Sequence, residues 1–352
     1  MLERFGWSPA LEDQFAQHAA DGLEPARVAV EHRDAYILYT ARGERPAELS
    51  GRLRHAVEER GDLPAVGDWV AIADPEGGER ALVPYVVPRR TKFSRMAAND
   101  HGQTVEQVVA ANVDVVFLTA GLDGDLNLRR LERYLTLGWE SGAEPVVVLT
   151  KTDLCDEVAA ALHEVESVAV GVPVHAVSNV TGEGIEALGS YFAGDRTVAA
   201  LGSSGVGKSS LVNRLAGEEL MPTGGLRADG KGRHTTTNRQ LLLLPGGGLF
   251  LDTPGMRELR LWESEEGLAA AFDDVAAMAA QCRFTDCAHA SEPGCAVRAA
   301  LADGTLDRER FDSWRKLQGE LAHLAIKQDA RLRAEARKER RRFARGTRKT
   351  SW

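Results

Sequence analysis

The 352-residue sequence has no long apolar run and few cysteines. Its longest apolar stretch, residues 108–122, is interrupted by Asn112 and Asp114 and is shorter than the ~20 apolar residues that a membrane span needs. Charged residues and a proline occupy the N-terminal region, where a secretory signal would need an apolar segment. Four cysteines in a chain of this length exclude a disulfide scaffold. We therefore expect a soluble, cytoplasmic protein without a membrane segment.

The composition is that of a globular protein with a sizeable core, because 43% of the residues are hydrophobic and 27% are charged. At ~150 residues per domain, the length favours two to three domains. The net charge of −9 is unevenly distributed: residues 331–352 contain ten Lys or Arg and two Glu, which leaves a net −17 on the rest. This basic tail favours a polyanionic partner, although a solvated charged helix would give the same pattern.

Short β-rich runs fill residues 26–90, after an N-terminal extension of residues 1–25 in which we expect a short helix. The runs are RVAVEH, AYILYT, ELSGRLR, DWVAIA and ALVPYVVP, and Gly or Pro separates most of them. Five strands at this spacing predict a small barrel of the OB type. Such a barrel would bind RNA or would be purely structural, and the pattern does not distinguish the two.

Strand and helix patterns alternate over residues 100–260, after a basic, polar connector at residues 89–103. We expect strands at 113–119, 145–150, 172–178 and 197–201, helices at 128–139, 156–166, 184–192 and 210–215, and two more strands flanking the glycines at 246–248. This alternation predicts a doubly wound α/β domain of about 160 residues. A helical region at residues 261–330 contains three of the four cysteines and precedes the basic tail.

Residues 202–209, GSSGVGKS, match the phosphate-binding pattern GxxxxGK[ST] between an apolar strand and a helical pattern. In such loops consecutive backbone N–H groups point at phosphate oxygens, and the helix N-terminus adds partial positive charge. Lys208 is expected at the β- and γ-phosphates and Ser209 at Mg²⁺. The predicted nucleotide-binding residues here are Gly202, Ser203, Ser204, Gly205, Val206, Gly207, Lys208, Ser209 and Ser210.

Two short motifs indicate that the base is guanine. TKTD at residues 150–153 resembles the NKxD motif of Ras-like GTPases, where the Asp accepts hydrogen bonds from the guanine N1–H and amino group and the Lys stem packs along the base. Thr150 replaces the usual Asn and lacks its amide. Ser178-Asn179 matches the Ser-Ala motif, which contacts the guanine O6 through a backbone N–H. We therefore expect Thr150, Lys151, Asp153, Ser178 and Asn179 at the base, with a changed side chain at position 179 tolerated.

The motif DTPG, residues 252–255, follows the apolar strand GLFLD. Asp252 is expected to hold Mg²⁺ through water, and the Gly255 N–H to reach the γ-phosphate. Alone DTPG is an ordinary turn sequence, but one hairpin after a P-loop it indicates a γ-phosphate sensor. The motifs occur in the order TKTD, SN, P-loop, DTPG, whereas a standard GTPase begins with the P-loop. This rotated order predicts a circularly permuted GTPase whose DTPG segment leads into the C-terminal region.

Three cysteines and a histidine lie within 14 residues, namely Cys282, Cys287, His289 and Cys295. Three thiolates and one imidazole are the ligand number and type of a closed, structural Zn²⁺ site. The alternative is a chance group of buried cysteines beside an unrelated histidine.

Together these motifs resemble the bacterial ribosome small-subunit-dependent GTPase A family. The resemblance covers roughly residues 26–330 and rests on TKTD, GSSGVGKSS, the run GRHTTT at residues 232–237, DTPG and the Cys-Cys-His-Cys cluster, in this order. It implies an N-terminal OB barrel, a circularly permuted GTPase domain and a C-terminal zinc domain. It also implies GTP hydrolysis stimulated by the small ribosomal subunit, contact with rRNA, and action late in subunit assembly.

The run GRHTTT lies between the P-loop and DTPG, where switch I belongs. One of Thr235, Thr236 and Thr237 is expected to bind Mg²⁺ when the γ-phosphate is present. Met256 stands where Ras-like enzymes often place a water-orienting Gln, which predicts slow unaided hydrolysis. We hypothesise that His234 orders the attacking water once the ribosome fixes switch I. The alternative is that His234 contacts only rRNA or solvent.

The expected partners are GTP or GDP and the small ribosomal subunit with its rRNA, and we expect a monomer. The barrel and the basic tail would face RNA, and one structural Zn²⁺ per chain would brace the C-terminal helical domain. Two other functions fit parts of the pattern. Met256 leaves open a nucleotide-gated RNA-binding scaffold with little hydrolysis. A P-loop kinase or ATPase acting on a small molecule is the other alternative, and TKTD argues against it.

Overall fold

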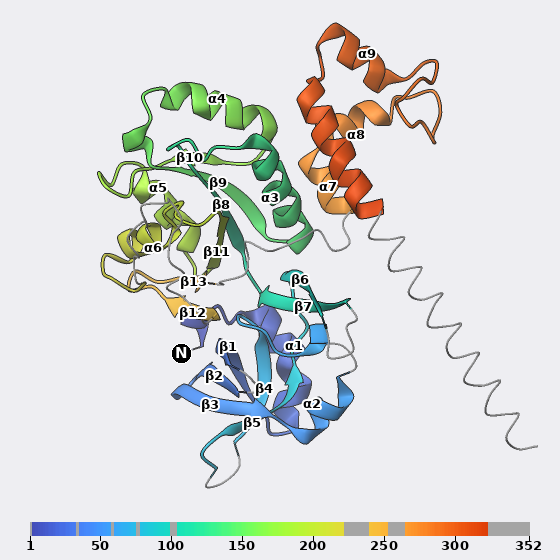
Figure 1. Ribbon diagram of the computed structural model, residues 1–352. Coiled ribbons are helices and arrows are strands. Elements are labelled where there is room, and N and C mark those ends of the chain that lie inside the picture. Colours follow the sequence, from blue (N-terminus) through green and yellow to red (C-terminus); the bar gives the residue numbers. More distant parts are fainter. Residues whose placement is uncertain are drawn as a thin grey trace, which may run out of the picture. The chain divides into compact units, whose positions relative to one another are not determined.

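The computed structural model describes residues 2–32, 35–57, 60–74, 78–98, 104–221, 239–252 and 265–322. The chain divides into two compact units, residues 1–260 and residues 261–352 (Figure 1). The first unit contains a barrel and an α/β domain, and the second is helical. Within the described ranges, no helix is both long enough and apolar enough to span a bilayer.

Five strands close the N-terminal barrel and confirm the predicted architecture. They are β1 (Glu24–His32), β2 (Ala35–Thr40), β3 (Gly43–Leu49), β4 (Trp69–Ala73) and β5 (Ala81–Val86). The strands pair in the order β1-β2-β3-β5-β4, and β4 pairs again with β1. The turn Glu3–Phe5 and helix α1 (Pro9–Ala20) add Phe5, Leu11 and Phe15 to the core. Phe5 stacks on Tyr39 of β2, which fixes the N-terminal segment to the barrel.

Two segments of this region differ from the sequence prediction. The run ELSGRLR is predicted as one strand, but β3 ends at Leu49 and α2 (Gly51–Ala56) follows it. The Ser50 hydroxyl accepts the Leu53 N–H at 3.1 Å, so Ser50 caps a helix where an extended chain was expected.

The predicted polar connector at 89–103 contains a strand. There β6 (Lys92–Ala98) pairs antiparallel with β7 (Thr104–Ala111). Earlier in the chain, a short turn at Arg60–Asp62 precedes β4. The hairpin carries polar cross-strand contacts, such as Lys92 Nζ to Glu106 Oε1 at 2.8 Å. A search for apolar runs does not detect such strands.

The α/β domain is built on five parallel strands. In spatial order these are β10 (Val174–Ala176), β9 (Glu144–Thr150), β8 (Val115–Gly121), β11 (Thr197–Gly202) and β13 (Leu249–Asp252), with β12 (Arg239–Leu243) antiparallel to β13. The helices are α3 (Leu128–Ser141), α4 (Val158–Val168), α5 (Ile185–Gly189) and α6 (Lys208–Ala216), with short turns at Thr152–Leu154 and Ser190–Phe192. Each strand and helix overlaps a predicted one.

Alternate side chains of the parallel strands face two helix layers. Phe117 and Phe250 lie in a buried cluster with apolar residues of α5 and α6. Helix α3 packs closely on the other face, where a Cβ at Gly138 would lie 3.3 Å from the Val116 side chain. Figure 1 shows α3 and α4 on one side of the sheet and α5 and α6 on the other. This is the predicted doubly wound arrangement.

Strand β1 belongs to both the barrel and the α/β sheet. Its first half pairs with β4, and its second half pairs with β12 at Val30 and Glu31. Glu31 also forms an ion pair with Arg239 at 2.8 Å, and the Tyr39 hydroxyl donates to the Leu241 carbonyl at 2.9 Å. The barrel and the α/β domain therefore share one continuous eleven-stranded sheet.

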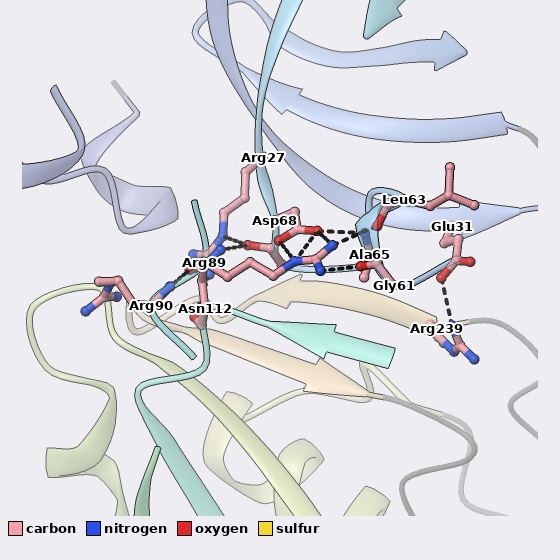
Figure 2. Close-up of polar contacts among 11 residues, drawn as sticks. Arg27, Glu31, Gly61, Leu63, Ala65, Asp68, Arg89, Arg90, Asn112 and Arg239 are labelled. Atoms are coloured by element: carbon pink, nitrogen blue, oxygen red, sulfur yellow. Dashed lines mark hydrogen bonds and ion pairs between the residues drawn. The ribbon is translucent and has the colours of Figure 1, made fainter. Parts of the chain in front are cut away.

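A buried guanidinium stands where the barrel meets the α/β domain (Figure 2). Arg27 of β1 is 2% exposed and donates to the Gly67 carbonyl at 3.1 Å, to the Asn112 carbonyl at 3.0 Å, and to the Phe5 carbonyl. Burial lowers the pKa of Arg27 to about 10, so the side chain stays charged at neutral pH. One side chain thus joins the N-terminal turn, the barrel and the segment leading into β8.

A buried charge pair lies beside Arg27 in Figure 2. The carboxylate of Asp68 is fully buried and accepts from both Nε and the terminal nitrogen of Arg89, at 2.7–3.1 Å. Arg89 also donates to the Gly61 and Leu63 carbonyls at 2.6 and 2.7 Å. Burial raises the pKa of Asp68 even though Arg89 opposes this shift.

The second unit is helical, as predicted. It contains α7 (Glu265–Ala271), α8 (Asp273–Ala279) and α9 (Ala296–Asp303), and the described residues 308–322 are also helical. Phe272 and Phe311 are buried in its core. The Arg310 guanidinium forms an ion pair with Asp274 at 2.7 Å and lies over the Phe272 ring. The basic tail at 331–352 lies outside the described residues.

Candidate functional site

The P-loop pattern lies between β11 and α6, as its sequence context predicts. β11 ends at Gly202, and α6 begins at Lys208 after Gly205 and Gly207, which have φ of +78° and +101°. These conformations favour glycine and let the loop curl back over the helix N-terminus. The Lys208 ammonium donates to the carbonyls of Gly202 and Ser203 at 2.8 and 2.7 Å, so it lies across the loop. A cationic group above a helix N-terminus is the chemistry of a phosphate site.

The TKTD segment is tied to the P-loop through its first residue. Thr150 ends β9 with a fully buried side chain. Its hydroxyl lies 2.6 Å from the Val206 carbonyl of the P-loop and 3.3 Å from the Ala120 carbonyl at the end of β8. The hydroxyl that replaces the usual amide therefore links the ends of β8 and β9 to the P-loop.

The loop after β10 is hydrogen-bonded to Gly207, which follows Val206 in the P-loop. Asn179 Nδ2 donates to the Gly207 carbonyl at 3.0 Å. Ser178 precedes it, and its hydroxyl donates to Asp153 Oδ1 at 2.5 Å, which joins the predicted base loops to each other. The structure thus brings together the predicted residues Thr150, Asp153, Ser178 and Asn179 beside the P-loop.

The loop between β8 and α3 contributes two carboxylates that the sequence analysis missed. Asp123 forms an ion pair with Lys151, the second residue of TKTD. Asp125 accepts from the Ser203 hydroxyl of the P-loop and forms an ion pair with Arg130 at 2.9 Å. Their signal in the sequence is positional, because loops after neighbouring parallel strands meet at one edge of the sheet.

Asp252 is the last residue of β13. The register pairs Leu251 with Ala199, so β13 ends beside β11 just before the P-loop. Asp252 also lies opposite Gln240 of β12. Ser209 and Ser210 lie in the first turn of α6, whereas the predicted residues His234, Thr235, Thr236, Thr237 and Gly255 lie outside the described residues.

The second unit holds the predicted metal ligands in one cluster. The ligand atoms of Cys282, Cys287, His289 and Cys295 all lie within 4.8 Å of one another. The Cys282 and Cys295 sulfurs are 3.8 Å apart, and His289 Nδ1 lies 3.6 and 3.5 Å from them. A tetrahedral Zn²⁺ site with ordinary bond lengths requires about 3.8 Å between sulfurs and about 3.6 Å between sulfur and nitrogen. These ligands therefore fit zinc.

Comparison with known proteins decides the family. Residues 86–262 match the family described as RsgA GTPase. A protein of Opitutus terrae named small ribosomal subunit biogenesis GTPase RsgA is 51% identical over 345 residues, which are 95% of this chain and 94% of that protein. The chain belongs to the RsgA GTPase family. A second RsgA, from Syntrophotalea carbinolica, is 46% identical and covers 97% of this chain and 94% of its own length.

Solved structures agree with the RsgA assignment. The crystal structure of YjeQ from Thermotoga maritima has a TM-score of 0.64 and 28% sequence identity, covering 85% of this chain and 99% of its own. YloQ, described as a circularly permuted GTPase, has a TM-score of 0.59 at 21% identity, with 86% and 96% covered, and so supports the fold. The predicted family and GTPase class of this chain are confirmed, and so is the circularly permuted fold.

Proposed function

We propose that this chain binds GTP at the carboxyl ends of β9, β10 and β11 and acts in the biogenesis of the small ribosomal subunit. The names of its relatives support the biological role. The observation that carries the site is the direct attachment of the TKTD and SN loops to consecutive P-loop carbonyls, at 2.6 and 3.0 Å. The P-loop supplies phosphate-binding groups, and the other two loops supply base-binding groups.

The nucleotide would be held by four segments of the chain. We assign GTP binding to Thr150, Lys151, Asp153, Ser178, Asn179, Gly202, Ser203, Ser204, Gly205, Val206, Gly207, Lys208, Ser209, Ser210 and Gly255. The exposed Asp153 carboxylate would accept hydrogen bonds from the guanine N1–H and amino group. Adenine lacks this donor pair, so Asp153 would select guanine. The Lys151 stem, held at its end by Asp123, would lie along the base.

Hydrolysis would need Mg²⁺, which would supply positive charge against the charge that develops on the phosphates. Ser209, Asp252 and one of Thr235, Thr236 and Thr237 are the residues that would hold it. Lys208 would leave the loop carbonyls for the phosphate oxygens. His234 would orient the attacking water, since Met256 offers no hydrogen bond to water.

The partner would be the small ribosomal subunit, contacted through its rRNA. The barrel and the basic residues of 331–352 would neutralise RNA phosphates, so affinity would fall steeply with added salt. The chain would act as a cytoplasmic monomer. One Zn²⁺, held by the three cysteines and His289, would brace the second unit.

The test is GTP turnover by the full chain, with and without purified small ribosomal subunits and with ATP as the control nucleotide. We expect slow unaided turnover and a large, GTP-specific stimulation by the subunits. Turnover of ATP at a similar rate would contradict the guanine assignment and favour a P-loop kinase or ATPase. Tight GTP-dependent subunit binding without stimulated turnover would instead support an RNA-binding scaffold.

A further inference from the structure

Asn179 makes a contact that its position after Ser178 does not suggest. The Ser-Ala motif uses a backbone N–H, so the sequence predicts that the side chain at position 179 can vary. In the structure the Asn179 side chain reaches the P-loop and donates to the Gly207 carbonyl at 3.0 Å. The adjacent carbonyl, that of Val206, accepts from Thr150 at 2.6 Å. Two successive P-loop carbonyls are thus each held by one of the two base loops.

We propose that Asn179 is a positioning residue for the nucleotide, and that its side-chain amide sets the distance between the guanine-binding loops and the P-loop. This inference rests on the proposed function, because it assumes that both sets of loops bind one nucleotide. It replaces the expectation that position 179 tolerates change.

The physical reason is that a nucleotide must bind two sites at once. The base and the phosphates bind different loops but are covalently joined, so the second contact gains from the first only when the loops hold the right separation. A link that exists before binding removes the cost of ordering these loops during binding. Loss of the link therefore weakens binding of the whole nucleotide more than it weakens binding of the phosphate part alone.

The fit of the amide against Gly207 is close. A Cβ added at Gly207 would lie 2.8 Å from Asn179 Nδ2, so the amide packs directly on this glycine. The other end of the amide, Oδ1, is buried and has no hydrogen-bond partner in the part of the chain that the structure describes. The link thus depends on the Nδ2 donor. An Asp at this position would place an oxygen against the Gly207 carbonyl and repel it.

The experiment compares GDP with pyrophosphate, which carries only the phosphate part. Titration of the full chain with fluorescent GDP, and competition by pyrophosphate, are measured for Asn179→Ala, Asn179→Asp and Asn179→Ser. The matched control is Val170→Ala, at an apolar residue that is 63% exposed. We expect Asn179→Ala to lower the affinity for GDP about 3- to 10-fold, which is the net effect of one hydrogen bond, and to leave the affinity for pyrophosphate unchanged. Asn179→Asp lowers the affinity for GDP further. Asn179→Ser keeps a hydroxyl donor and lowers this affinity less than Asn179→Ala does.

Two results would overturn the proposal. Equal weakening of GDP and pyrophosphate would mean that Asn179 only supports the P-loop, and unchanged GDP affinity would mean that the link has no role in binding. A double-mutant cycle with Thr150→Val tests the same link from β9, and coupling between the two positions is expected because they hold adjacent carbonyls. A wild-type chain that binds pyrophosphate but not GDP would refute the proposed function instead.

Discussion

The Asp153 carboxylate is held in place for accepting hydrogen bonds by the neighbouring Ser178 hydroxyl. The Ser178 hydroxyl donates to Asp153 Oδ1 at 2.5 Å, and this contact fixes the carboxylate while the residue stays exposed. An Asn at position 153 would keep an oxygen for Ser178 and for the base N1–H. It would also turn an amide N–H₂ toward the substituent on C2 of the base, which is a donor in guanine and an acceptor in xanthine.

Asp153→Asn is therefore expected to lower affinity for GDP about 10- to 100-fold, since hydrogen bonds to a charged group are lost. The same change is expected to raise affinity for xanthosine diphosphate. Competition titrations with both nucleotides measure the exchange of preference. Asp156→Asn, at an exposed carboxylate three residues away, is the matched control and should alter neither affinity. An Asp153→Asn variant that keeps its preference for GDP would show that another group reads the base.

Residue identities at this site were predictable only where a local motif carries them. The P-loop and TKTD have fixed spacings because their groups act on one ligand from one short segment. Asp123 and Asp125 belong to no such motif. They reach Lys151 and Ser203 because β8 lies between β9 and β11, and that neighbour relation exists only in the folded sheet.

At the scale of elements, the cluster of Cys282, Cys287, His289 and Cys295 joins the loop before α9 to the helices of the second unit. The His289 ring packs against Phe311 and Trp314, so the ligand set and the apolar core are continuous. A small unit gains a large part of its folding free energy from a structural metal. Removal of zinc should therefore unfold the second unit.

Chelation, or Cys287→Ser, is expected to reduce helix content in circular dichroism and to release one zinc per chain. GDP affinity should change less than twofold, because the residues that we propose to bind the nucleotide all belong to the first unit. Cys155→Ser removes the free thiol outside the cluster and should leave zinc content and helix content intact. A wild-type chain that contains no zinc, or a Cys287→Ser chain that retains it, would contradict the assignment.

Elements with a strong apolar pattern were predictable, and those shaped by local polar contacts were not. β8 and β9 are buried on both faces and read as continuous apolar runs. Helix α2 depends on the Ser50 cap, and the hairpin β6-β7 on pairs such as Lys92–Glu106. The Ser50 cap is a single short contact in a segment whose residues also fit a strand, and Lys92 and Glu106 become neighbours only once the hairpin has formed.

At the scale of the whole molecule, the buried pair Asp68–Arg89 tests how firmly the barrel is held. Arg89→Met would leave the Asp68 carboxylate fully buried without its ion partner, which costs about 3–5 kcal/mol in the free energy of unfolding. Burial already raises the pKa of Asp68, and loss of Arg89 would raise it further. When the pKa of a carboxyl is higher in the folded than in the unfolded state, the free energy of unfolding of the protein falls as the pH rises.

The deficit of Arg89→Met relative to the wild type should therefore be larger at pH 7 than near pH 5, as measured by urea denaturation at both values. Arg90→Met is the matched control. Arg90 pairs with Asp114 at 2.9 Å, but its side chain is 52% exposed, and such pairs contribute about 0–1 kcal/mol. A deficit that is equal for both variants, or independent of pH, would contradict the argument.

The joining of the two parts of the first unit was not predictable. Both the barrel and the α/β domain have local patterns, but the pairing of β1 with β12 involves two short stretches with no special sequence signature. Glu31 and Arg239 are 208 residues apart in the chain. Many pairs of an acidic and a basic residue exist at such separations, and only the closed sheet selects this one.

This separation has a consequence for the time course of folding. During synthesis the barrel strands emerge early, but the second half of β1 waits for β12, which follows 208 residues after Glu31. At about 5–20 residues per second this wait lasts roughly 10–40 seconds. Throughout that interval one edge of β1 has backbone N–H and C=O groups open to any other strand. A chain that stops before residue 239 would keep this edge exposed, and such fragments should associate with one another where the complete chain does not.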